Sequence, residues 1–213
     1  HTGMRRLVPM HKTLLTVAAL AAVLTPLGCA NPFETDVDNP NAVVEDALNN
    51  AAGATTLVNG LGASVTRAMT AIYGPYHAAT DELTWVGSRE FWKNLDDGDV
   101  ADPVNEYTDG AYPFVSEARW TANYTLPKVL AFDAAGTLRN RRDLVRAHIY
   151  AAVIYITIGD MFDDFVLASD RTVAGAPVGE ANMRIFYDSA IVFLDRALPV
   201  AVAVADIELQ RQV

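Results

Sequence analysis

Cysteine is almost missing from this chain, because Cys29 is the only one among its 213 residues. A single cysteine cannot form an internal disulfide, and paired-cysteine zinc or redox motifs are excluded with it. The sequence also contains no glycine-rich phosphate loop, no nucleophile elbow and no His-Glu-x-x-His motif. Nucleotide, acyl-transfer, thiol and zinc-hydrolase chemistry therefore have no support in the sequence.

Positive charge is also scarce. The chain has 16 Lys and Arg residues against 26 Asp and Glu, a formal net charge of −10. Three of the basic residues lie before Cys29 and none of the acidic ones does, so the chain from Cys29 onward carries 13 minus 26, or −13. Such a surface repels phosphate backbones and anionic lipid head groups. We expect no nucleic-acid partner and no attachment to a membrane through charge.

The apolar run near the N-terminus is too short to cross a bilayer. It extends from Leu14 to Leu24, whereas a spanning helix needs about 20 apolar residues. Basic residues precede it and small Gly28 stands before Cys29, which is the layout of an export signal. We predict that residues 1–28 are a lipoprotein signal peptide and that Cys29 becomes the lipidated first residue, anchored by acyl chains such as palmitate. An ordinary secretory signal is the alternative, because Pro26 replaces the usual aliphatic residue.

Residues 29–41 are rich in Pro, Asn and Asp and have no helical period, which predicts a lipidated tether. Asn41 can cap a helix that begins at Ala42, the predicted start of a domain covering residues 42–213. Within that domain apolar residues recur at helical spacing in five stretches: 55–72, 76–83, 114–132, 138–158 and 183–198. No strand pattern is present, so the sequence predicts an all-α fold.

Prolines and glycines set the expected helix ends. Gly74-Pro75 is expected to interrupt the first helix, and Pro127 to kink or break the third. The stretch 138–158 is apolar on nearly every face, which predicts a helix buried between neighbours and ended by Gly159. Small residues mark the expected crossing points of an antiparallel helix pair, the unit of a tetratricopeptide-like repeat: Ala147, Ala151, Ala190 and Ala197.

Residues 85–112 differ in composition from the rest of the domain. They contain glycine, proline, acidic residues and aromatic residues, and their apolar residues do not recur at helical spacing. They predict a long irregular loop, and such loops in a compact domain are more often functional than accidental.

Several ordered segments together resemble the N-terminal portion of the SusD/RagB family of outer-membrane lipoproteins. They are Cys29, Asp38-Asn39-Pro40-Asn41, Asp81-Glu82-Leu83, the helix from Arg146 to Phe162 and the helix containing Tyr187, Ala190, Leu194, Ala197 and Leu198. The resemblance implies an all-α, tetratricopeptide-like helical repeat on the cell surface, lipid-anchored in the outer membrane. It also implies that a C-terminal portion is missing here, because family members are longer.

By this resemblance the protein binds nutrients, oligosaccharides or peptides, and passes them to a TonB-dependent, SusC-like transporter barrel. It implies a nutrient-binding lid rather than an enzyme, without a cofactor. The alternative is a lipid-anchored helical-repeat scaffold that binds other envelope proteins and no small ligand.

A glycan offers both C–H faces and hydroxyl groups, so its site needs flat rings beside polar groups. The loop supplies rings that could stack and side chains that could hydrogen-bond, and we expect the ligand site there: Trp85, Trp92, Tyr107 and Tyr112, with Arg89, Asn94 and Asn105. The competing interpretation is that Trp85 and Trp92 pin the loop to the helices. Trp120, within a helical period, is expected in the core.

Acidic and histidine residues do not form a recognisable catalytic or metal motif. The cluster Asp96-Asp97-Gly98-Asp99 with Glu106 lacks the spacing of an EF-hand, and we expect a solvated turn without metal. Asp81-Glu82 and Asp163-Asp164 are adjacent pairs whose side chains point apart on a helix. His148, on an apolar helix, is expected to be a hydrogen-bonded core residue.

Overall fold

The computed structural model describes residues 48–168, 173 and 175–213. The predicted signal peptide, the lipidation site at Cys29, the tether at 29–41 and the helix start at Ala42 all lie outside the described residues. The described residues belong to one compact unit that extends to the last residue, Val213.

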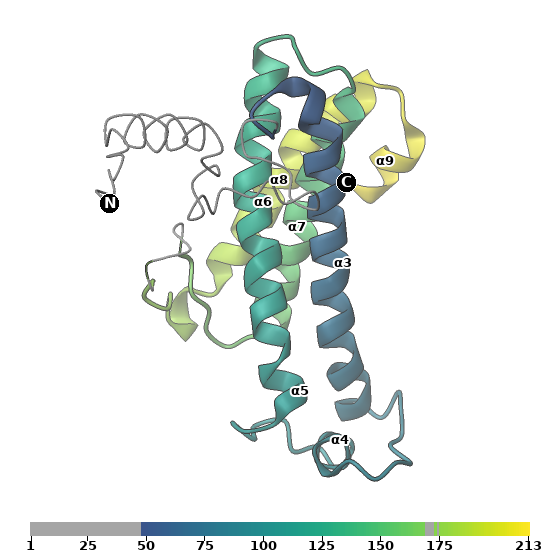
Figure 1. Cartoon of the computed structure of the whole chain (residues 1–213), viewed down its shortest axis with the longest axis vertical. Helices are drawn as coiled ribbons and strands as arrows, with labels where there is room; N and C mark the ends of the chain where they lie inside the picture. The colour runs from purple at the N-terminus through teal and green to yellow at the C-terminus, as the bar shows by residue number, and fades with distance from the viewer. Residues whose placement is uncertain (1–47, 169–172, 174) are drawn as a thin grey trace, which may run out of the picture. The chain divides into compact units, whose positions relative to one another are not determined.

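Helices dominate the described part, which contains no β-strand apart from an isolated bridge between Val166 and Pro177. The elements are η2 (Ala51–Gly53), α3 (Ala54–Ala79), α4 (Glu90–Asp96), α5 (Glu106–Asp109), α6 (Ala111–Ala134), α7 (Arg141–Met161), η3 (Glu180–Asn182), α8 (Arg184–Ala203) and α9 (Ile207–Gln212). The long helices α3, α6, α7 and α8 lie side by side, and each runs opposite to the one before it (Figure 1). The prediction of an all-α fold is confirmed.

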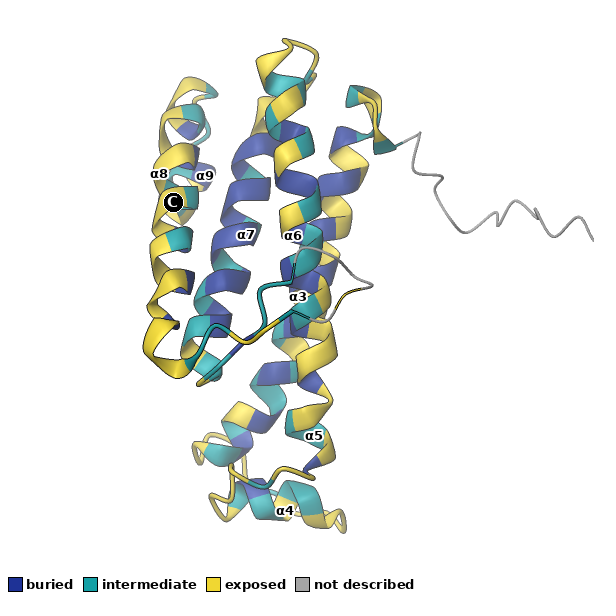
Figure 2. Cartoon of the chain, turned by 90° about the vertical axis from the view of Figure 1, so that its left-hand side faces the viewer, coloured by how far each residue is buried: buried dark blue, intermediate teal, exposed yellow. Residues whose placement is uncertain are grey.

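Helix α7 is the centre of the bundle and packs against α3, α6 and α8. Most of its surface is dark blue in Figure 2, because its residues are buried on several sides. By length and composition alone α7 is apolar enough to cross a membrane, yet 61% of its apolar window is buried inside the fold. The prediction of a buried helix between neighbours is therefore confirmed.

The four small residues that the sequence marks on α7 and α8 are buried, and Ala197 of α8 packs in one cluster with Val145 and Ile149 of α7. Ala147 and Ala151 of α7, and Ala190 and Ala197 of α8, are all fully or almost fully buried. Side chains this small let two helix backbones approach closely, with larger core residues such as Phe186 filling the space between them.

Neither proline ends its helix, so the predicted interruption at Pro75 and the predicted break at Pro127 are wrong. Helix α3 continues through Pro75 to Ala79, and α6 continues through Pro127. A proline inside a helix removes one backbone hydrogen bond. Buried residues lie on both sides of each proline, including Ile72 and Ala78 in α3, so packing of the whole helix outweighs that local loss.

Gly159 does not end α7 as predicted. It lies inside the helix, which closes at Met161 and is followed by Phe162 in extended backbone. A Cβ atom at Gly159 would lie 2.7 Å from Cζ of Tyr187. The glycine instead gives the Tyr187 ring room to cross α7, where its hydroxyl donates to Oδ1 of Asp160 at 2.7 Å.

A buried carboxylate joins α3 to α7. Asp143 is fully buried, its Oδ2 accepts a hydrogen bond from Thr55 Oγ1 at 2.6 Å, and its Oδ1 lies 3.3 Å from Arg146 Nη1. Arg146 also donates to Oδ1 of Asn59 on α3, at 2.9 Å. These directional bonds fix the register of two helices that would otherwise meet through interchangeable apolar contacts.

Residues 80–110 form a separate layer beyond the end of α7, which we call the end segment. The prediction of one irregular loop over 85–112 is wrong in part, because α4 and α5 lie within it and α6 begins at Ala111. Within the end segment only Leu95 and Asn105 are buried. The segment covers the lower ends of α3 and α6 in Figure 2.

Two predictions about single residues need correction. Trp120 is half-buried rather than in the core, and its ring stacks on Tyr124 with centroids 5.0 Å apart. His148 is buried as predicted, but its Nδ1 atom has no hydrogen-bond partner among the described residues. Burial, with a smaller effect of the Arg196 charge, lowers the pKa of His148 from 6.5 to about 4.

Candidate ligand-binding site

Polar side chains fold the end segment into a defined shape. Asn105 accepts a hydrogen bond from the backbone of Tyr107 at 3.0 Å, which caps α5, and donates to the carbonyl of Phe91 at 3.0 Å. Asp96, at the end of α4, accepts from the backbone N–H of Trp85 at 3.2 Å. These bonds hold the segment's rings in place with little help from apolar burial.

Three rings of the end segment form what we call the aromatic cluster: Trp85, Trp92 and Tyr107. The Trp92 ring is the shared member, with its centroid 5.9 Å from Trp85 and 4.5 Å from Tyr107. Arg89 adds a charge at the edge, since its Nη1 donates to the Tyr107 hydroxyl at 2.8 Å. That hydrogen bond is the main reason why the pKa of Arg89 is raised.

The aromatic cluster also touches α3. A Cβ atom at Gly74 would lie 3.2 Å from Cη2 of Trp92, so the glycine leaves room for the indole. All three cluster rings are half-buried, which leaves part of each ring accessible. The same rings can therefore hold the end segment against α3 and also contact a ligand.

A cavity of about 360 Å³ adjoins the aromatic cluster, within the size range of small-molecule sites. Trp92 and Tyr107 line it together with Thr70, Gly74 and Ala111 of the helices. The arrangement offers flat ring surface for C–H groups and hydroxyl groups for polar contacts, which is the pairing that a sugar needs.

The structure does not bring the other candidates into this group. Tyr112 is on α6, where its ring lies 6.0 Å from Phe162 and 5.1 Å from Phe165. Asn94 is half-buried on α4, and its backbone carbonyl accepts from Asp99 at 2.8 Å. Buried Asn105 has the capping role described above. Trp85, Arg89, Trp92 and Tyr107 are therefore the candidates that lie together.

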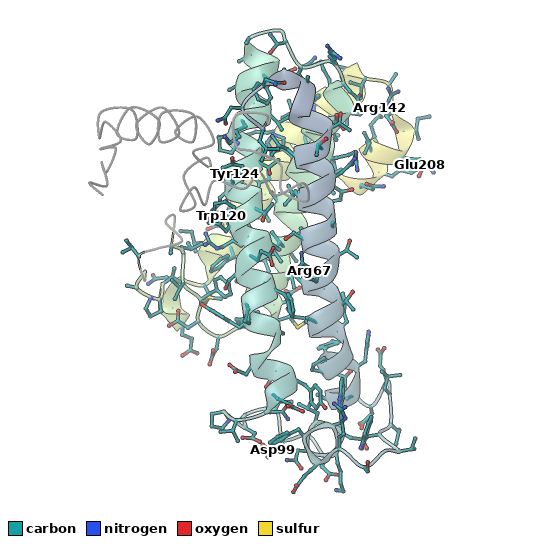
Figure 3. All side chains as sticks on the ribbon, in the orientation of Figure 1. Arg67, Asp99, Trp120, Tyr124, Arg142 and Glu208 are labelled. Atoms are coloured by element: carbon teal, nitrogen blue, oxygen red, sulfur yellow. The ribbon has the colours of Figure 1, made fainter. Side chains whose placement is uncertain are left out.

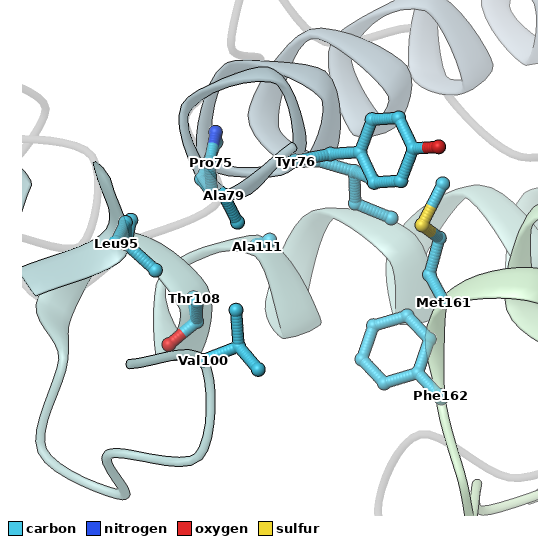
Figure 4. A pocket seen from close by; sticks show the side chains of 10 residues that line it. Pro75, Tyr76, Ala79, Leu95, Val100, Thr108, Ala111, Met161 and Phe162 are labelled. Atoms are coloured by element: carbon cyan, nitrogen blue, oxygen red, sulfur yellow. The ribbon is translucent and has the colours of Figure 1, made fainter. Parts of the chain in front are cut away.

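A second cavity, of about 300 Å³, was not expected from the sequence (Figure 4). Tyr76 of α3, Leu95 and Val100 of the end segment, and Met161 and Phe162 at the end of α7 line it. These residues come from well-separated parts of the chain. No local pattern marks them as neighbours.

Several acidic residues of the described part of the chain have structural partners. Asp96 binds the Trp85 backbone and Asp97 pairs with Lys93. Asp164 Oδ1 accepts from the backbone N–H of Gly179 and of Phe165, each at 2.8 Å. In the part of the chain that the structure describes, no three His, Cys, Asp or Glu side chains are grouped to hold a metal ion.

Comparisons with protein-family models, with curated proteins and with solved structures give no match to this chain.

Proposed function

We propose that this protein is a surface lipoprotein of the SusD/RagB type that captures a nutrient, in the first place an oligosaccharide, for a TonB-dependent outer-membrane transporter. Lipidation of Cys29 would hold it at the outer membrane. The helix arrangement supports the proposal, because α3 with α6 and α7 with α8 are antiparallel pairs stacked through α7, as in a tetratricopeptide-like repeat.

The observation that carries the proposal is the aromatic cluster beside its cavity. Its rings lie on a segment at one end of the bundle and remain partly accessible. A plain helical-repeat scaffold would need only short, regular turns between its helices. The end segment is longer than such turns and leaves part of the Trp85 and Tyr107 rings accessible, which favours ligand capture over a scaffold role.

Ligand capture is tested by titrating the purified chain with neutral oligosaccharides and following binding by calorimetry. Trp85→Ala should weaken binding about tenfold, because a stacked ring contributes roughly 1 kcal/mol or more. Leu83→Ala is the matched control, since Leu83 is 55% exposed in the same segment and belongs to no ring contact. Equal affinity of both variants and the parent would contradict a ligand site at the aromatic cluster.

Membrane anchoring is tested separately by Cys29→Ser in a bacterial host. We expect the variant to move from the membrane fraction to the soluble fraction, because the acyl chains supply the attachment. Retention of the variant in the membrane fraction would contradict lipidation at Cys29.

A lipid-anchored scaffold is the second candidate, and exposed apolar residues on α8 favour it. Ile191, Leu198 and Val202 are 45–57% exposed, and such residues can dock another envelope protein. The scaffold would bind its partner without any oligosaccharide, so the titration above separates the two candidates.

A further inference from the structure

A buried arginine, Arg119, lies outside the aromatic cluster and has no carboxylate partner among the described residues. Arg119 is on α6 and is 4% exposed. Its Nη2 donates to the carbonyl oxygen of Ala168 at 2.6 Å, a hydrogen bond that ties the loop after α7 to α6. Its Nε is buried and has no hydrogen-bond partner among the described residues.

An arrangement of this kind is costly for a folded chain. Guanidinium carries five N–H donors and a permanent charge, and burial of such a charge costs several kcal/mol unless an anion accompanies it. Carboxylates are abundant here, with 26 Asp and Glu against 16 Lys and Arg. Yet in the described part of the chain none lies within ion-pair distance of Arg119, and neighbouring Glu117 is 3.6 Å from Arg67 instead.

Arg119 lines a cavity of about 340 Å³ between α6 and the loop after α7. Tyr112 and Trp120 supply aromatic surface in this cavity, Ser116 supplies a hydroxyl, and Ala168 lies on the loop side. Figure 3 shows Trp120 on the side of α6 that faces away from α3, and Arg67 on α3 itself. The cavity is thus separate from the aromatic cluster, which belongs to the end segment.

We propose that this cavity receives the carboxylate group of a small organic ligand, with Arg119 as its binding residue. A planar carboxylate matches the guanidinium fork, and the rings of Tyr112 and Trp120 accept the apolar part of the same molecule. Two kinds of nutrient carry such a group: an acidic sugar and the C-terminus of a short peptide. The inference rests on the proposed capture of nutrients and names a chemical class of ligand for it.

The test uses the purified full chain and two matched pairs of probes in calorimetry at low salt. One pair is trigalacturonate and its methyl ester, and the other is trialanine and its C-terminal amide. In at least one pair the acid should bind about tenfold tighter than its neutral counterpart, as expected for a charged hydrogen bond. The pair that shows the preference identifies the source of the carboxylate. Equal binding of acid and neutral forms in both pairs, or no binding at all, would overturn the proposal.

Variants locate the effect. Arg119→Met should abolish the preference for the acid over its neutral counterpart, while Arg119→Lys should recover only part of the preference because it lacks the fork. Glu117→Gln, which removes a negative charge from the cavity wall, should strengthen acid binding a few-fold. If Arg119→Met fails to fold, judged by circular dichroism, the Glu117→Gln variant decides: unchanged affinity for the acid would overturn the proposal.

These results are separable from the proposed function as a whole. Copurification with a transporter barrel does not depend on Arg119, so a barrel that copurifies while neither acid is preferred overturns the carboxylate site alone. Loss of the barrel together with a clear acid preference overturns the importer function and leaves the site in place.

Discussion

The helix bundle and the end segment are stabilised in different ways. In the bundle, apolar and small side chains are buried along α3, α6, α7 and α8, and the main polar contact is the buried Asp143 network. In the end segment only Leu95 and Asn105 are buried, and side chains bonded to backbone atoms define the shape. The bundle therefore supplies the global stability, whereas the end segment is a locally ordered platform placed on it.

Loss of a central ring in the bundle should have the largest effect. Phe186 is fully buried and its ring packs against Tyr155 and Phe165. Phe186→Ala should lower the free energy of unfolding by about 3–5 kcal/mol through lost burial and the resulting cavity. Urea denaturation followed by circular dichroism measures the change. Ile191→Ala, at a 56% exposed position of the same helix, is the control and should change stability by less than about 0.5 kcal/mol.

Acid should destabilise the bundle through His148. Its pKa is about 4 in the fold against 6.5 for an ordinary histidine, so the unfolded chain binds the extra proton first. The contribution of neutral His148 is fully present above pH 6.5 and is lost as the pH falls towards 4, on the order of 3 kcal/mol in total. His148→Leu should flatten the pH dependence of the unfolding free energy in that window. A parallel curve for the variant would contradict this role.

Two glycines of α3 give a matched test of close packing in the bundle. A Cβ atom at Gly62 would lie 2.9 Å from the Tyr150 ring, whereas a Cβ atom at Gly60 meets nothing within 4 Å. Gly62→Ala should destabilise the protein by about 1–2 kcal/mol through overpacking. Gly60→Ala should stabilise it by roughly 0.5–1 kcal/mol, because alanine is the better helix former. Equal melting temperatures of the two variants would show that Tyr150 moves aside freely.

The smallest global effect is expected in the end segment. Asn105→Ala removes the α5 cap and the hydrogen bond to the Phe91 carbonyl, a local loss of about 1–2 kcal/mol. Amide hydrogen exchange should accelerate across residues 85–110 while exchange in α7 stays unchanged. Faster exchange in α7 as well would mean that the end segment and the bundle unfold as one unit.

The same contrast explains what the sequence could predict. Helix α7 and the burial of its alanines follow from apolar periodicity, because burial of a helix face requires that spacing. The predicted interruption at Pro75 and the predicted break at Pro127 are wrong, because local proline rules do not include the packing that carries a helix through these residues. Gly159 was misjudged for a similar reason, since its role depends on Tyr187 of another helix.

The candidate site was predictable only in part. The aromatic residues that the sequence marks in an aperiodic stretch include Trp85, Trp92 and Tyr107, whose rings lie together in the structure. Their pairing depends on the Asn105 and Asp96 hydrogen bonds, which no periodicity encodes. The sequence does not mark Arg119 as a binding residue, because a single arginine in a helical stretch has the same pattern whether it faces solvent or a cavity.

The most direct test of the account is affinity purification of the full-length, lipidated protein from outer membranes of its own host, followed by identification of the proteins retained. The proposed function predicts that a TonB-dependent barrel is retained with the parent protein and also with Phe114→Ala, a surface control on α6 that is 37% exposed. Absence of any such barrel from the parent's partners would contradict it.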